Sequence, residues 1–154
     1  MNNNRHLVHA ALIAAVYAVL TIAFAPLSYG QIQVRFAEAL TILPFFTPAA
    51  IPGLFIGCIV ANIFGPGGVP DVIFGSAASL ISAYLSYKMP VKWLVPLPPV
   101  VVNGIIIGYL LKYLYQLPLF ATMGWVALGE LISCYFIGYP LLLLLEKYRD
   151  KIFI

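Results

Sequence analysis

Six long apolar segments make up nearly the whole chain, and short polar or Gly- and Pro-rich stretches separate them. An α-helix that crosses a bilayer needs about 20 predominantly apolar residues, and clusters of Gly and Pro interrupt helices. The pattern therefore predicts an all-α integral membrane protein, in which residues 1–154 form a single domain of six transmembrane helices. The expected helices cover about residues 7–27, 36–46, 49–64, 71–87, 97–112 and 118–145.

Two of the connections carry signals of their own. Residues 28–35 alternate between polar and apolar types, which is typical of a loop or a short strand-like excursion. Residues 65–70 read Gly-Pro-Gly-Gly-Val-Pro and form the strongest helix breaker in the chain, so Asp71 is expected to begin the fourth helix. The second segment is short and is interrupted by Pro44.

The composition agrees with a membrane protein and excludes the soluble classes. Hydrophobic residues make up 63% of the chain and charged residues only 8%, whereas soluble domains carry about 25% charged residues. A small soluble domain cannot bury so much apolar surface. The two cysteines, Cys58 and Cys134, lie in different apolar segments and are interpreted as small buried hydrophobes.

The basic residues predict how the helices are oriented. With six spans, the places where these residues gather all fall on one side of the membrane, which the positive-inside rule makes the cytoplasmic side. Both termini are therefore expected inside the cell. Lys112, at an outer helix end, is an exception, and its long side chain can reach the interface. The residues that set the orientation are Arg5, Lys88, Lys92, Lys147, Arg149 and Lys151.

Six polar residues stand out because they fall in or beside the apolar segments. A charged side chain at the centre of a spanning helix costs roughly 2.5–3.5 kcal/mol on insertion scales and commonly marks a functional site. On the predicted topology the set converges on the outer half of the bundle, with Asn103 in the middle of its helix and Glu130 in the outer half or middle of its own, which favours a pocket open to the outside. The six are Arg35, Glu38, Asn62, Asp71, Asn103 and Glu130.

Each of these residues also has a purely structural interpretation, and that of Glu130 is the weakest. Arg35 and Glu38 are three residues apart and can pair with each other on a helix. Asp71 can cap the fourth helix, and the two asparagines can join neighbouring helices by hydrogen bonds. Glu130 has neither a capping position nor a partner nearby in the sequence, which makes it the strongest candidate for a ligand contact.

The first segment carries a ridge of small residues. Ala10, Ala14 and Ala18 repeat every four residues, and Ala11 and Ala15 form a second register beside them. Small residues at this spacing let another helix approach closely. The ridge therefore serves either packing inside the bundle or contact with a partner helix.

Four segments together resemble a known family. They read RFAEALTILPFFTPAAIPG at 35–53, GCIVAN at 57–62, DVIFGS at 71–76 and PPVVVNG at 98–104. In them, and over about residues 8–147, the sequence resembles the queuosine-precursor transporter family (QueT type). That family consists of substrate-binding S components of energy-coupling factor (ECF) transporters. The Gly- and Pro-rich loop at 65–70 departs from the family pattern.

The resemblance implies a six-helix S-component fold in a bacterial plasma membrane, together with partner subunits. A transmembrane coupling T subunit would contact the alanine ridge, in the register of Ala10, Ala14 and Ala18 or in that of Ala11 and Ala15. Two cytosolic ATPases would hydrolyse ATP, in agreement with the absence of a phosphate-binding motif from this sequence. The chain itself is expected to need no cofactor and no metal ion and to have no enzymatic activity.

The implied substrate is a 7-deazaguanine, such as 7-cyano- or 7-aminomethyl-7-deazaguanine or queuine. Its guanine-like edge offers two parallel donors, and a carboxylate offers two parallel acceptors. The carboxylate would come from Glu130, the first choice, or from Glu38 or Asp71, and Arg35 would orient Glu38. A second carboxylate would favour a cationic aminomethyl group. The amides that would meet the carbonyl group and the ring nitrogens are Asn62, Asn103 and Gln33.

Three other interpretations stand beside this one. An S component for another small vitamin-like solute would share the fold, so only ligand binding separates the two. A small intramembrane enzyme would need a set of metal ligands or a nucleophile beside a base, and neither is visible in the sequence. A purely structural assembly subunit would bind no ligand.

Overall fold

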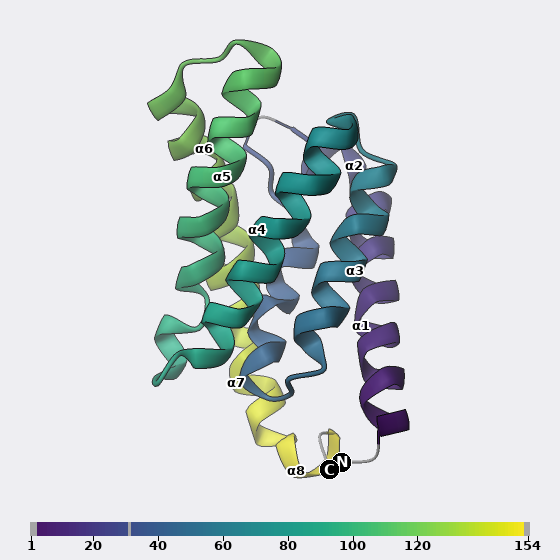
Figure 1. Cartoon of the computed structure of the whole chain (residues 1–154). Helices are drawn as coiled ribbons and strands as arrows, with labels where there is room; N and C mark the ends of the chain where they lie inside the picture. Colours follow the sequence, from purple (N-terminus) through teal and green to yellow (C-terminus); the bar gives the residue numbers. More distant parts are fainter. Residues whose placement is uncertain (1–2, 31, 153–154) are drawn as a thin grey trace.

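The computed structural model describes residues 3–30 and 32–152, and these are mostly helical, as Figure 1 shows. No β-strand occurs in these two stretches, so the all-α class predicted from the sequence is confirmed. The helices are α1 (Asn3–Ala23), α2 (Ala25–Ser28), η1 (Phe36–Phe45), α3 (Ala50–Ile63), α4 (Gly68–Lys88), η2 (Lys92–Leu94), α5 (Leu97–Tyr115), α6 (Leu119–Leu131), η3 (Ile132–Gly138), α7 (Tyr139–Lys147) and α8 (Arg149–Ile152). The elements η1 and η2 are 3₁₀ helices, and η3 is a π-helix.

Several observed helix ends differ from the predicted ones. α1 begins at Asn3 and ends at Ala23, and Pro26 lies in the separate short helix α2. α4 begins at Gly68, which makes the turn into the helix with a φ of 63°, a conformation that glycine adopts at little cost. The polar stretch before η1 is a loop where it is described, at residues 32–35, and Gln31 lies outside the described residues.

In the described part of the chain, four helical stretches are long and apolar enough to cross a membrane. The other two apolar helices, η1 and α3, have 10 and 14 residues. α3 is about 21 Å long at the rise of an α-helix, and η1 about 20 Å at the 3₁₀ rise, against about 30 Å for the hydrocarbon core. The number of six spanning helices is therefore not confirmed. The four long stretches are Asn4–Ala23, Gly68–Lys88, Lys92–Tyr115 and Leu119–Lys147.

The short helix η1 lies in the middle of the bundle (Figure 1). It packs against α1, α3, α4, η3 and α7, while α5 packs against both α4 and α6. Seven of its ten residues are buried, so η1 is a core element rather than a surface helix. Pro44 near its end has no N–H to donate within the helix, and Thr41 Oγ1 donates to the carbonyl oxygen of Glu38 at 2.6 Å.

α1 and α3 approach each other closely through small residues. A Cβ atom on Gly57 would lie 2.8 Å from the carbonyl oxygen of Ala14, and one on Gly53 would lie 2.8 Å from that of Ala10. Ala10 and Ala18 are accordingly buried within the chain. Ala11 and Ala15 are exposed. The first register of the alanine ridge therefore packs inside the bundle, and the second remains on its surface.

Gly57→Ala is expected to lower the melting temperature of the purified protein, because its methyl group would meet the backbone at Ala14. Overpacking of this kind costs about 1–3 kcal/mol. Gly124→Ala in α6 is the matched control, since nothing lies within 4 Å of its Cβ position and alanine favours helix by about 0.5–1 kcal/mol over glycine. Thermal unfolding of both variants in one detergent makes the comparison. Equal melting temperatures would mean that α1 and α3 move apart at no cost.

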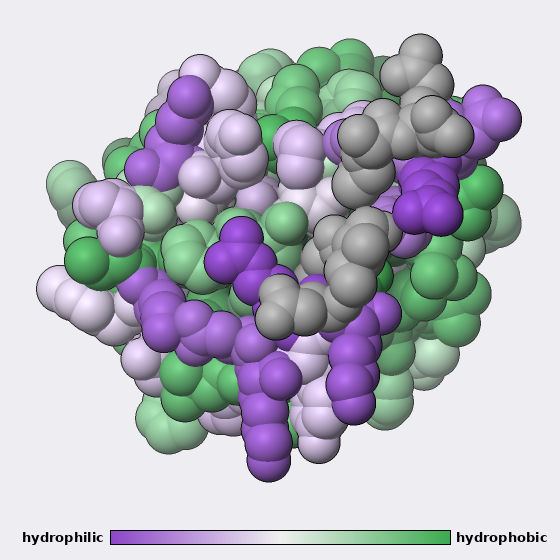
Figure 2. Space-filling model, turned by 90° about the horizontal axis from the view of Figure 1, so that it is seen from below, coloured by the Kyte–Doolittle hydropathy of each residue, from purple (hydrophilic) through white to green (hydrophobic). Residues whose placement is uncertain are grey.

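The start of α1 and the short helix α8 lie at the same end of the bundle (Figure 1). Figure 2 looks onto this end, where hydrophilic side chains gather. Nζ of Lys92, which precedes α5, pairs with Oε1 of Glu146 in α7 at 2.6 Å. Much of the basic charge that sets the predicted orientation thus shares one end with the start of α1. The opposite end is called the distal end below.

Candidate functional site

A cluster of buried polar side chains lies where η1 begins, α3 ends and α4 begins, toward the distal end, and extends to α5 and α6. All seven residues that the sequence predicts as ligand contacts are buried, each with at most 7% of its surface exposed. Charged side chains are almost never fully buried unless they are paired. The polar contacts of each residue therefore decide what the cluster can bind. The seven are Gln33, Arg35, Glu38, Asn62, Asp71, Asn103 and Glu130.

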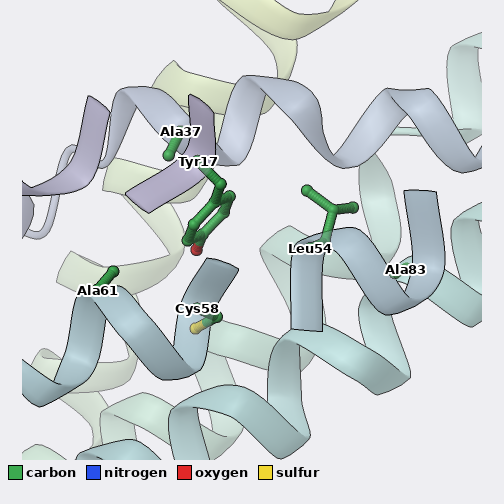
Figure 3. Close-up of a cluster of buried hydrophobic side chains, with 6 residues drawn as sticks. All are labelled: Tyr17, Ala37, Leu54, Cys58, Ala61 and Ala83. Carbon is green, nitrogen blue, oxygen red and sulfur yellow. The ribbon is translucent and has the colours of Figure 1, made fainter. Parts of the chain in front are cut away.

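Glu38 in η1 has one occupied and one unoccupied carboxylate oxygen. The phenol of Tyr17 in α1 donates a hydrogen bond to Oε1. Figure 3 shows Tyr17 crossing from α1 with its hydroxyl end directed toward Cys58 of α3. Oε2 is buried and accepts no hydrogen bond from the described residues. A buried acceptor without a donor costs about 1–3 kcal/mol, and more if it is charged, so Glu38 is only half satisfied.

Arg35 does not form the predicted ion pair with Glu38 within the described chain. It precedes η1 in an extended conformation, with φ −100° and ψ 99°, so the helical spacing that would join the two side chains does not apply. Its guanidinium carbon lies 5.6 Å from the centre of the Tyr29 ring, a distance at which a cation is attracted to an aromatic face. Nε and Nη2 are buried and donate to none of the described residues.

Asn62 joins α3 to α4, as the helix-joining interpretation predicts. Its Nδ2 donates to the backbone carbonyl of Asp71 at 3.0 Å and to Sγ of Cys58 at 3.4 Å. Gly75 in α4 makes the approach possible, because a Cβ there would lie 2.5 Å from Nδ2 of Asn62. Oδ1 of Asn62 is buried and receives no hydrogen bond within the described chain.

Asp71 lies in the first turn of α4, after the helix has already begun at Gly68. No side-chain hydrogen bond caps this helix end, so the prediction that Asp71 caps the helix is wrong. An acidic side chain in the first turn is favoured by the helix dipole. Asp71 is 7% exposed, and no hydrogen bond between described residues ends on its carboxylate. The carboxylate is therefore available to another group.

Glu130 near the end of α6 has partners for both carboxylate oxygens, although the sequence around it suggested none. Nδ2 of Asn103 in α5 donates to Oε1 at 3.0 Å, and Sγ of Cys134 donates to Oε2 at 3.6 Å. The same thiol lies 3.6 Å from the backbone carbonyl of Glu38. Glu130 therefore joins α5 to α6 and is linked to Glu38 through Cys134.

The loop before η1 and Tyr29 cover the cluster at the distal end. The loop crosses α6 at Gly129, where a Cβ atom would lie only 1.8 Å from the carbonyl oxygen of Ile32. Gln33 beside it is buried and has a left-handed φ of 50°. The Tyr29 phenol donates to the carbonyl oxygen of Ala61 at 2.6 Å. Burial raises the pKa of this phenol, which keeps it a donor, although Arg35 acts in the opposite direction.

Four residues of the site were not identified from the sequence: Tyr17, Thr41, Cys58 and Cys134. Tyr17 was recognisable in principle, because it is a phenol in the middle of an apolar segment and a buried phenol usually has a hydrogen-bond partner. The prediction that both cysteines are buried is confirmed, and they are free thiols, but each contacts polar groups of the cluster. No three His, Cys, Asp or Glu side chains within residues 3–30 and 32–152 are grouped as metal ligands would be.

These features define a class of protein, a small helical membrane protein that encloses charged side chains near one end of its bundle. The sequence matches the QueT transporter family over residues 7–147. The chain belongs to this family and is a membrane transport protein. A similar protein is the "Queuosine precursor transporter QueT" of Lactococcus lactis subsp. cremoris (strain MG1363), which is 31% identical over 144 residues, or 83% of this chain and 84% of the relative. No solved structure matches the chain.

Proposed function

We propose that this chain is the substrate-binding S component of an ECF-type importer and that it takes up a queuosine precursor. The observation that carries the proposal is the buried cluster of Arg35, Glu38 and Asn62, which keeps polar atoms without hydrogen-bond partners among the described residues. Leaving such atoms unpaired is costly, and a polar ligand that pairs with them removes the cost. The printed function of the relative supports a queuosine precursor as that ligand.

The proposed topology has six membrane segments, with the distal end outside and both termini in the cytoplasm. The hydrophilic end in Figure 2 would then face the cytoplasm, in agreement with the positive-inside rule. The cluster opens to the outside once the loop at 32–35 and Tyr29 move. The two shorter helices, η1 and α3, would lie within the membrane. Surrounding helices would shield the polar backbone of η1, and the bilayer would thin beside α3.

The proposed partners are a transmembrane T subunit and two cytosolic ATPases. The sequence carries no phosphate-binding motif, so ATP hydrolysis belongs to the ATPases. Ala11 and Ala15 are the exposed register of the alanine ridge, and they supply a surface that a partner helix can approach closely. Ala10 and Ala14 support this surface from behind through their packing against α3, and Ala18 in the same register is buried.

The proposed substrate is a 7-deazaguanine, whose donors and acceptors suit this mixture of carboxylates, amides and a guanidinium. Glu38 and Asp71 offer acceptors, Arg35 offers donors, and the Asn103–Glu130 pair lines the side formed by α5 and α6. Tyr29 offers an aromatic face at the covered end, and stacking on a base contributes roughly 1–3 kcal/mol.

Thermal unfolding of the detergent-purified protein with a ligand panel tests the proposal. The panel contains 7-cyano- and 7-aminomethyl-7-deazaguanine, queuine, guanine, riboflavin, thiamine and biotin. A ligand at 100 times its Kd stabilises the native state by about 2.7 kcal/mol, so a 7-deazaguanine is expected to raise the melting temperature by several degrees. A rise with a vitamin alone would keep the S-component role and replace the substrate. No rise with any compound, with and without the T subunit, would contradict the proposal.

A further inference from the structure

Four buried polar atoms in the cluster have no hydrogen-bond partner among the described residues, and they form a complementary set. Nε and Nη2 of Arg35 are donors, whereas Oε2 of Glu38 and Oδ1 of Asn62 are acceptors. All three side chains are at least nine-tenths buried, with exposed fractions of 4%, 1% and 0%. Buried polar atoms are paired in the great majority of native proteins. The two acceptors call for two donors on a ligand. The two donors belong to one guanidinium, so a single acceptor on the ligand can receive both.

Tyr17 and Cys58 connect Glu38 of η1 to Asn62 of α3, since Tyr17 and Cys58 belong to the same buried cluster. Tyr17 donates to Glu38, and Cys58 accepts from Asn62 at 3.4 Å. Figure 3 shows the hydroxyl end of Tyr17 directed toward Cys58. The backbone N–H of Glu38 donates to the backbone carbonyl of Arg35 at 2.9 Å, so these two residues are adjacent at the start of η1. These contacts join the three side chains that carry the unpartnered donors and acceptors into one buried cluster.

We infer that Arg35, Glu38 and Asn62 recognise the 6-oxo, N1–H and 2-amino edge of a guanine-type base, an assignment that rests on the proposed function. Arg35 donates to the 6-oxo oxygen, Oε2 of Glu38 accepts from N1–H, and Oδ1 of Asn62 accepts from the 2-amino group. In a 7-deazaguanine a carbon atom replaces the ring nitrogen N7 of guanine. The 6-oxo oxygen is therefore the only acceptor on that side of the base. Both free N–H groups of Arg35 then converge on this oxygen.

The same inference gives Glu130 a different part from the one that the sequence favoured. Asn103 and Cys134 already donate to its two oxygens. Glu130 holds α5 and α6 together beside the ligand, and Glu38 takes the base edge, because its Oε2 has no donor of its own.

The first test compares three ligands on the wild-type protein by titration calorimetry. The three ligands are 7-deazaguanine, its analogue without the 2-amino group, and 7-deazaadenine. Each carries the same 7-substituent, the one that the protein binds best. Removing the 2-amino group should weaken binding at least about 10-fold, since Asn62 is left unpaired. The adenine type sets a donor against Arg35 and an acceptor against Glu38, so it should bind about 1,000-fold more weakly. Affinities within about threefold of each other would overturn the inference.

Two variants then assign the contacts to residues. Glu38→Gln keeps the bond from Tyr17 and places an amide N–H where Oε2 was, so the preference for the 6-oxo over the 6-amino base should fall at least about 10-fold. Glu130→Gln is the matched control, an equally buried carboxylate, and it should leave this preference unchanged even if it weakens every ligand equally. Asn62→Ala is the second variant, in which the preference for the 2-amino group should disappear.

The outcomes separate this inference from the proposed function. If the wild-type protein binds no 7-deazaguanine, the proposed function fails and the inference fails with it. If it binds 7-deazaguanine but Glu38→Gln and Glu130→Gln change the preference equally, the proposed function stands and the base-edge assignment is wrong. If Glu38→Gln does not fold, the Asn62→Ala comparison and the three-ligand series on the wild-type protein still decide the assignment.

Discussion

7-Aminomethyl-7-deazaguanine is expected to bind this protein at least about 100-fold more tightly than 7-cyano-7-deazaguanine at neutral pH. The cluster contains three buried carboxylates, Glu38, Asp71 and Glu130, against the single guanidinium of Arg35. An uncompensated buried charge is strongly unfavourable, and the ammonium of the aminomethyl group compensates one, whereas the neutral nitrile compensates none. A 100-fold ratio corresponds to about 2.8 kcal/mol.

Competition binding of the two compounds to the purified protein measures this ratio. Asp71→Asn is the informative variant, because no hydrogen bond from the described residues ends on the Asp71 carboxylate and the ammonium is expected to pair with it. In this variant the ratio should fall at least about tenfold. A wild-type protein that binds the nitrile as tightly as the amine would show that the carboxylates do not recognise positive charge.

Ala15→Trp is expected to abolish assembly with the T subunit and uptake into cells, while ligand binding by the isolated chain is retained. Ala15 is exposed on α1, and an indole at the centre of a close helix–helix contact prevents the backbones from approaching. The residue lies outside the polar cluster, so the base-binding groups are unaffected. Co-purification of the T subunit and uptake of a labelled precursor measure the loss, and calorimetry measures the retained binding.

Two other alanine variants make this prediction specific. Ala121→Trp changes an exposed alanine on α6 and should leave assembly intact. Ala14→Trp replaces a residue whose carbonyl lies 2.8 Å from the Cβ position of Gly57, so it should destabilise the α1–α3 contact as well. If Ala15→Trp and Ala121→Trp assemble equally well, the partner surface is not on this face of α1.

The helical class and the set of buried polar residues were predictable from the sequence, because both follow from composition and from the cost of polar groups in apolar segments. The pairing of those residues was not. Arg35 and Glu38 are spaced as helical neighbours, yet the helix begins only after Arg35. Glu130 found its partners in Asn103, on another helix, and in Cys134, which was interpreted only as a hydrophobe. The Asn103 contact depends on tertiary packing, which one sequence does not contain. Cys134 lies only four residues after Glu130, so this neighbour on the helix was recognisable from the spacing.

The length of the second segment also misled the sequence interpretation. Its apolar residues are compatible with a spanning helix, but they form a ten-residue 3₁₀ helix in the core. Asp71 was expected to begin a helix after Pro70, but the glycine at 68 begins it earlier. Hydrophobicity alone revealed neither the type of helix that η1 forms nor the residue at which α4 begins.

The shortness of α3 has a consequence for the surrounding lipid. Its 14 residues give about 21 Å of helix, and its exposed side chains, such as Ile56 and Ile63, are apolar. On the proposed topology the bilayer beside α3 must thin by several ångströms, at a fraction of a kcal/mol per Å. α3 packs directly against α1, the helix that carries the proposed partner surface. On this topology the membrane would be thinned beside that surface, and part of the elastic work of tilting the bundle in the bilayer would be done before any partner binds.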